Sequence, residues 1–161
     1  MNSTSYLRGS VPSRMLDLLF VCPERRGTRI RRVVEVEASI ELEYYLRRKL
    51  PANHSPFKDV SVIWSDGVRV FLVDGVGMMM KGPFDYEGLP DAHIAFWDKV
   101  LVGREAMARS MAAKIAEGAG SKGVFTAMPK ESRATLAFAK RVGFDIIRET
   151  DQVFVLTLLF T

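Results

Sequence analysis

The sequence has one cysteine and two histidines, and this scarcity removes two classes of site. Cys22 has no second cysteine with which to form a disulfide inside the chain. Structural zinc sites use clustered cysteine and histidine ligands, whereas His54 and His93 lie far from Cys22 and from each other. We therefore expect neither a disulfide framework nor a metal site.

Long apolar runs are also absent. Of the 161 residues 48% are hydrophobic, yet no run approaches the roughly 18 residues that a membrane span needs. The polar start, residues 1–5, does not have the pattern of a secretory signal. A chain of this length fits one domain with a sizeable core, and no repeat or linker divides it. We expect a single domain over residues 1–161 that works in the cytoplasm.

The net charge of +4 comes from the first third of the chain. Residues 1–50 contain ten Lys or Arg and six Asp or Glu, whereas residues 51–161 contain thirteen of each. Five of these cations lie between Arg25 and Arg32 and could face nucleic acid or an acidic protein surface. No aromatic side chains alternate with them as stacking platforms for bases. A solvated basic face is the favoured interpretation, and a nucleic-acid partner is not expected.

The first half of the chain predicts a helix among strands. Residues 13–20 suit either a short helix or a strand, and residues 22–27 are typical of a turn. Alternating apolar residues predict a strand over 29–37. A helix follows over 39–50, with Ser39 as N-cap, glutamates in its first turn and basic residues in its last. Its inward side chains are expected to be Ile40, Leu42, Tyr45, Leu46 and Leu50.

Residues 51–57 then predict a loop, and hairpins follow it. Short Asp-Gly turns at 65–67 and 74–75 separate alternating apolar runs, a pattern typical of antiparallel hairpins. The strands are expected at 60–64, 68–73 and 76–81.

The strongest functional signal is a strand that leads through a glycine into a helix. Residues 92–98 have the composition of a strand, and from Gly103 to Ile115 the apolar residues fall at helical spacing. Such a turn leaves N–H groups unpaired at the helix start, where the helix dipole also attracts an anion such as a phosphate. We expect the working site there.

The remaining chain predicts a strand, a helix and a final hairpin. Residues 123–129 form a short apolar run stopped by proline, and residues 131–142 form a helix that Gly143 ends. Strands over 146–148 and 153–160 flank a polar turn.

In this order the sequence resembles the GNAT superfamily of acyl-CoA-dependent N-acetyltransferases, particularly the small divergent GNAT-like proteins of bacteriophages. The resemblance is carried by Val102-Gly-Arg-Glu-Ala106 and by Pro129-Lys-Glu-Ser-Arg-Ala134, which leads to Phe138–Phe144. It covers residues 58–161 as the core and leaves residues 1–50 as a divergent basic part. The implied fold is α/β (α+β), with a mixed, mostly antiparallel central sheet, two splayed parallel strands and flanking helices.

The resemblance also implies a site for acetyl-CoA between the splayed strands. The pantetheine arm would pair with the 92–98 strand, the pyrophosphate would sit on the N–H groups near Gly103, and an apolar slot would hold the acyl group. The cofactor-binding residues implied in this way are Trp97, Val102, Gly103, Arg104, Glu105, Ala106, Ser132 and Phe138.

Two residues are candidates for the catalytic work of such an enzyme. His93 shares a strand face with Trp97, and the ordinary histidine pKa near 6.5 suits a base that takes a proton from an ammonium. Glu87, with Asp85, could select a cationic amine from the loop before that strand. The structural alternatives are a hydrogen-bonding histidine within a strand and solvated surface carboxylates.

The sequence departs from the family pattern in three places. Only Gly103 remains of the Arg/Gln-x-x-Gly-x-Gly/Ala loop, Glu131 or Ser132 replaces the usual asparagine at the last helix, and Ala139 stands where many members carry a tyrosine acid.

If the protein is active, the resemblance implies an acyl-CoA N-acyltransferase whose acceptor is an amine on a small molecule or a protein. The alternative is a catalytically silent GNAT-like module that binds other subunits in a phage virion or acts as an accessory protein, in the host cytoplasm or the particle. The number of subunits stays open.

Overall fold

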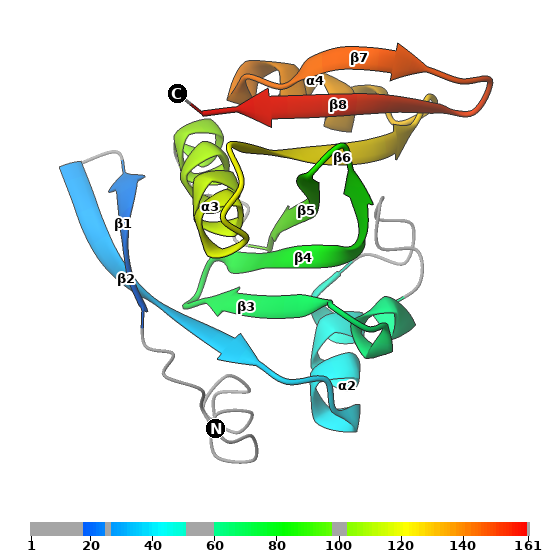
Figure 1. Cartoon of the computed structure of the whole chain (residues 1–161). Helices are drawn as coiled ribbons and strands as arrows, with labels where there is room; N and C mark the ends of the chain where they lie inside the picture. Colours follow the sequence, from blue (N-terminus) through cyan, green and yellow to red (C-terminus); the bar gives the residue numbers. More distant parts are fainter. Residues whose placement is uncertain (1–17, 25–26, 51–59, 98–102, 161) are drawn as a thin grey trace.

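The computed structural model describes residues 18–24, 27–50, 60–97 and 103–160 (Figure 1). Within these ranges the strands form one eight-stranded sheet in the order β1-β2-β3-β4-β5-β6-β8-β7. The strands are β1 (Leu18–Glu24), β2 (Gly27–Val36), β3 (Arg69–Val73), β4 (Gly77–Tyr86), β5 (Leu89–Phe96), β6 (Gly123–Pro129), β7 (Asp145–Glu149) and β8 (Val153–Leu159). The helices are α2 (Ile40–Lys49), the 3-10 helix η1 (Val60–Trp64), α3 (Arg104–Gly118) and α4 (Arg133–Val142).

The sheet consists of two antiparallel halves that meet at a narrow joint. Strands β1 to β5 pair antiparallel in chain order, and β6, β8 and β7 form the second antiparallel group. Between the halves, the described parts of β5 and β6 pair in parallel at one register position, Asp91 opposite Phe125. The predicted mixed, mostly antiparallel sheet with splayed parallel strands is therefore confirmed.

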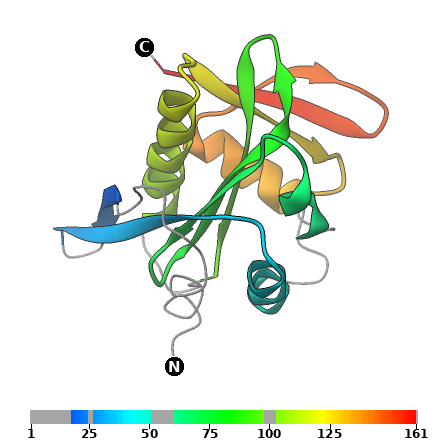
Figure 2. The same ribbon diagram turned by 60° about the horizontal axis from the view of Figure 1, so that its bottom comes forward.

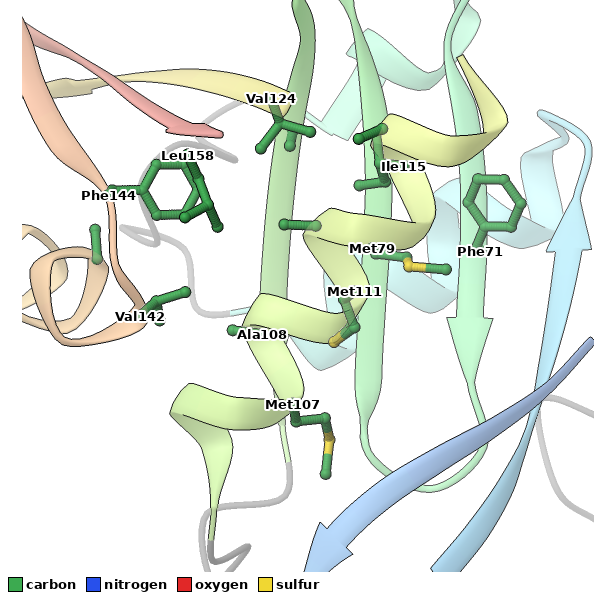
Figure 3. Packing of buried hydrophobic residues seen from close by; sticks show 14 of the residues in the cluster. Phe71, Met79, Met107, Ala108, Met111, Ile115, Val124, Val142, Phe144 and Leu158 are labelled. Atoms are coloured by element: carbon green, nitrogen blue, oxygen red, sulfur yellow. The ribbon is translucent and has the colours of Figure 1, made fainter. Parts of the chain in front are cut away.

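Helices cover both faces of the sheet. On one face, Met107, Met111 and Ile115 of α3 belong to a core that includes strands of both halves, and Figure 3 shows Met111 and Ile115 close to Met79 of β4. On the other face, α2 packs on a second core formed with η1 and strands β2 to β5. Figure 2 shows the strands lying between α2 and α3. Alternate residues of β5 contribute to the two cores, so this strand connects both sides of the molecule.

The local signals at the helix ends act as the sequence predicted. The Ser39 hydroxyl accepts a hydrogen bond from the N–H of Leu42 at 3.0 Å, which caps α2. Gly103 has φ of 77° and precedes α3, a conformation that glycine adopts without a Cβ penalty. None of the helices in the described ranges combines the length and apolar character that crossing a membrane requires.

Several predictions of local structure are wrong. Ile40 is 75% exposed instead of inward, because it lies on the same outer face of α2 as exposed Tyr44, on the side opposite Leu42. Residues 60–64 form a 3-10 helix instead of a strand, with Val60 and Ile63 buried at a spacing of three. Residues 22–24, predicted as part of a turn, belong to β1, and residues 25–26 lie outside the described ranges. The loop predicted at 51–57 lies outside the described residues.

Candidate active site

A cavity of about 380 Å³ lies where β5 and β6 diverge beyond the Asp91–Phe125 pair. Its walls include β5 from Ala92 to Phe96 and β6 from Thr126 to Met128. On their other edges these strands pair with β4 and β8, so each strand presents one backbone edge to the cavity. Such an edge offers N–H and C=O groups to any extended chain that lies against it.

We call this cavity between the diverging strands β5 and β6 the wedge. Helix α3 begins at its open end. Arg104, the first residue of α3, is exposed and lines the cavity. Gly103 makes no side-chain cap, and its carbonyl accepts the first helical bond, from the N–H of Met107 at 3.1 Å. The N–H groups of the first turn therefore lie beside a cation at the cavity mouth, an arrangement that favours an anion.

Glu105 places a carboxylate in the same turn. A hydrogen bond from its own backbone N–H is the largest cause of its lowered pKa, and a bond from Arg141 adds to it. Its Oε1 lies 3.1 Å from Nε of Arg141, which joins α3 to α4. Glu105 thus supplies an internal negative charge at the place where the sequence predicted a phosphate. Ala106 is exposed in the same first turn.

Helix α4 forms the far wall. Phe138 lines the cavity and contacts the ring of Phe96 edge-on, with centroids 6.3 Å apart. The guanidinium of Arg141 lies over Phe138, 5.8 Å from the ring centre, and Arg141 also lines the cavity. Ser132 precedes α4, and its carbonyl accepts the N–H of Leu136 at 3.0 Å. Apolar and aromatic groups therefore form the slot, with arginines at its rim.

A buried acid and histidine lie at the closed end of the wedge. His93 lines the cavity, and its Nε2 lies 2.9 Å from Oδ1 of Asp91, whose residue is 2% exposed. Gly82 of β4 lies under both side chains, because a Cβ at this position would overlap Oδ2 of Asp91 and crowd Nε2 of His93. Sequence reasoning missed Asp91, although its position two residues before His93 on one strand was a usable signal.

Other residues singled out in the sequence lie elsewhere. Glu87 is exposed, with φ of 50°, in the tight turn between β4 and β5, and Asp85 accepts the Gly88 N–H in that turn. Trp97 packs edge-on against Tyr45 of α2, with ring centroids 5.9 Å apart. Neither Glu87 nor Trp97 is among the described residues that line the cavity. Val102 lies outside the described ranges.

The described ranges contain no group of three or more Cys, His, Asp and Glu side chains able to hold a metal ion. The chemistry available in the wedge is therefore that of a strand edge, an apolar slot, cations at a helix start and one acid–histidine pair.

Comparison with known proteins supports the fold. No protein-family model and no curated protein matches the sequence. Among solved structures, the N-acetyltransferase PseH from Campylobacter jejuni superposes with a TM-score of 0.56 at 12% identity, over 80% of this chain and 99% of that one. RimL, a ribosomal L7/L12 alpha-N-protein acetyltransferase, superposes with a TM-score of 0.57 at 8% identity, over 93% of this chain and 99% of RimL. An acetyltransferase of the GNAT family from Bacillus anthracis has a TM-score of 0.52 at 8% identity, over 87% of this chain and 98% of that one. The chain therefore has the GNAT fold.

Proposed function

We propose that the protein transfers an acyl group from acetyl-CoA to an amine. The observation that carries this proposal is the wedge between β5 and β6, which opens directly beyond a single parallel pair and has the start of α3 at its mouth. A strand edge beside an apolar slot suits a narrow amide-containing arm, and cations at a helix start suit phosphates.

The residues of the wedge fit acetyl-CoA in three respects. The free edges of β5 and β6 would pair with the amides of the pantetheine arm, the first turn of α3 with Arg104 and Arg141 would hold phosphates, and Phe96 with Phe138 would border the arm. When bound, acetyl-CoA supplies the activated acyl group. Because the phosphates would lie at the α3 end of β5, the arm would extend back along β5 toward His93.

The acceptor would approach from the α2 side. Even-numbered residues of β5 such as Ile94 pack in the α3 core, whereas Ala95 belongs to the α2 core. His93 lies on the same face as Ala95 and opposite Met80, so its ring is on the α2 side of the wedge. Helices α3 and α4 contribute to the other wall.

The reaction requires a group that accepts a proton from the ammonium of the acceptor. Of the three protons of an ammonium, one stays on the product amide, one ends on the thiol sulfur and one is released. Among the described residues of the cavity lining, the imidazole of His93 is the side chain with a nitrogen lone pair that would accept the first proton. Ala139 lines the cavity without a proton to give, so water would protonate the leaving thiolate.

The solved structures of the same fold support amine acetylation in general terms. One of them is PseH in complex with acetyl coenzyme A, with a TM-score of 0.52. Another is a spermidine N-acetyltransferase chimera from Vibrio cholerae and hSSAT, with a TM-score of 0.52. RimL is described as acting on a protein. All three names describe the transfer of an acetyl group to a nitrogen atom of the acceptor.

Thiol release tests the proposal directly. Acetyl-CoA would be incubated with the protein and with a polyamine, a small primary amine or a peptide with a free α-amine. We expect turnover with at least one class, and its loss in Ala134→Trp, which places an indole in the cavity lining. Ala137→Trp is the matched control, because Ala137 is exposed on α4 and lies outside that lining. Equal turnover in the two variants, or none in the unmodified protein with any amine, would contradict the proposal.

A further inference from the structure

The geometry points to Asp91 as a positioning residue for the transfer: it holds His93 at the closed end of the wedge, with the imidazole proton on Nε2. This inference rests on the proposed function. It concerns a buried acid that neither the sequence pattern nor the proposed binding of the donor requires.

The position of Asp91 is unusual for a residue with only a packing role. It is the residue of β5 that pairs with β6, so its side chain lies where the two halves of the sheet join and the wedge begins. It is 2% exposed, and a buried carboxylate is costly unless it is paired. The partner is His93, with Nε2 2.9 Å from Oδ1, within hydrogen-bonding distance.

The backbone of β4 is adapted to this pair. The register of β4 against β5 shifts between Lys81 and Asp85, and Gly82 lies in that shifted stretch. Any larger residue at Gly82 would overlap the Asp91 carboxylate. A bulge and a glycine where side chains approach the backbone closely are features that re-aim side chains near functional sites.

The contact determines which nitrogen of His93 can act as a base. An ionised carboxylate only accepts hydrogen bonds, so the neutral ring facing Asp91 carries its proton on Nε2. Its lone pair is then on Nδ1, which is buried. Because Nδ1 is buried, the amine that delivers a proton to it must displace some of the atoms that bury it. An amine substrate that enters the wedge beside acetyl-CoA would do so and would pass its proton directly or through one water.

The tautomer can be measured on the intact protein. The chain has only two histidines, so the nitrogen resonances of His93 are identified by comparison with His54→Gln. We expect the Nε2–H form of neutral His93 to dominate in the unmodified protein, and both forms to be populated in Asp91→Asn, because an amide both donates and accepts. A dominant Nδ1–H form in the unmodified protein, or an unchanged tautomer in Asp91→Asn, would overturn the inference.

Kinetics with the accepted amine provide the second readout. In Asp91→Asn we expect kcat to fall on the order of 100-fold, the lower end of what a base contributes, with the KM for acetyl-CoA unchanged. Gly82→Ala should reproduce this loss without altering Asp91 or His93 chemically, and it covers the case in which Asp91→Asn does not fold. Gly118→Ala is the control, because its Cβ would meet only Arg69 at 3.8 Å. Unchanged kcat in both test variants would overturn the inference and leave the proposed function in place. An unmodified protein that acetylates no amine would instead contradict the proposed function itself.

Discussion

Glu105→Gln removes the negative charge that the chain itself places at the start of α3. The Glu105 carboxylate accepts a hydrogen bond from its own backbone N–H and pairs with Arg141 at 3.1 Å, so it occupies groups that would serve a phosphate. If the phosphates of acetyl-CoA lie there, the carboxylate repels them and competes for the same donors. We expect the glutamine variant to bind acetyl-CoA more tightly and to be slightly less stable.

The two effects have different sizes. The Glu105 side chain is 42% exposed, and exposed ion pairs contribute about 1 kcal/mol or less to stability. Repulsion between one carboxylate and a diphosphate at roughly 8 Å, with an effective dielectric of about 20 and salt screening, is about 1 kcal/mol. Relief of this repulsion corresponds to roughly a fivefold decrease in Kd.

The assay is calorimetric titration with acetyl-CoA and, separately, with acetyl-pantetheine, which has no phosphates. The gain should appear with acetyl-CoA alone, and Glu117→Gln, at the exposed far end of α3, should behave as the unmodified protein. Weaker or equal acetyl-CoA binding in Glu105→Gln, or an equal gain with acetyl-pantetheine, would refute the reasoning.

Acid should remove the stability difference between the two proteins. The pKa of Glu105 is lowered in the folded state from the ordinary value of 4.5. Its contribution to stability is therefore fully present above that ordinary value and is lost as the pH falls through the folded-state pKa. Urea unfolding at neutral pH and near pH 3 should show a difference that shrinks at acid pH, and a difference that grows would contradict the assigned contacts.

The remaining predictions concern stability and the cations of the cavity mouth. Ser39→Ala should cost about 1 kcal/mol in urea unfolding, because the bond to the Leu42 N–H is lost; no change would show that water replaces the cap. Met111→Ala should cost about 2–5 kcal/mol, since Met111 is 0% exposed, whereas Ile40→Ala at 75% exposure should stay within about 0.5 kcal/mol, and similar costs would contradict the packing. Arg104→Ala should weaken acetyl-CoA binding and reduce its salt dependence, and unchanged binding would remove Arg104 from the phosphate site.

The second half of the fold could be predicted well because its signals are local. The apolar run at 123–129 ends in proline and corresponds to β6 with the same bounds, and α3 follows the glycine that the sequence marked as its start. Residues 60–64 show the limit of such signals. A short apolar run fits a strand or a turn of helix equally well, and burial of Val60 and Ile63 under α2 decides between them.

The site was predictable only in part, because it depends on contacts between distant strands. Arg104, Phe138 and His93 come together as lining residues of one cavity, although they lie on α3, α4 and β5. The spacing of Asp91 and His93 puts them on one strand face, whereas no pattern in the chain specifies the register shift of β4 that brings Gly82 against both side chains. Trp97 was predicted to bind the cofactor, but tertiary packing directs its ring to Tyr45 on α2 instead.

Hydrogen exchange with and without acetyl-CoA tests the central claim most directly. If the donor lies in the wedge, amide protection should increase along β5 from Ala92 to Phe96, along the facing part of β6 and in the first turn of α3. The exposed strand β7 should be unaffected, which provides an internal reference. Protection confined to other elements, or no change at a saturating concentration of acetyl-CoA, would contradict the assignment of the wedge as the acyl-donor site.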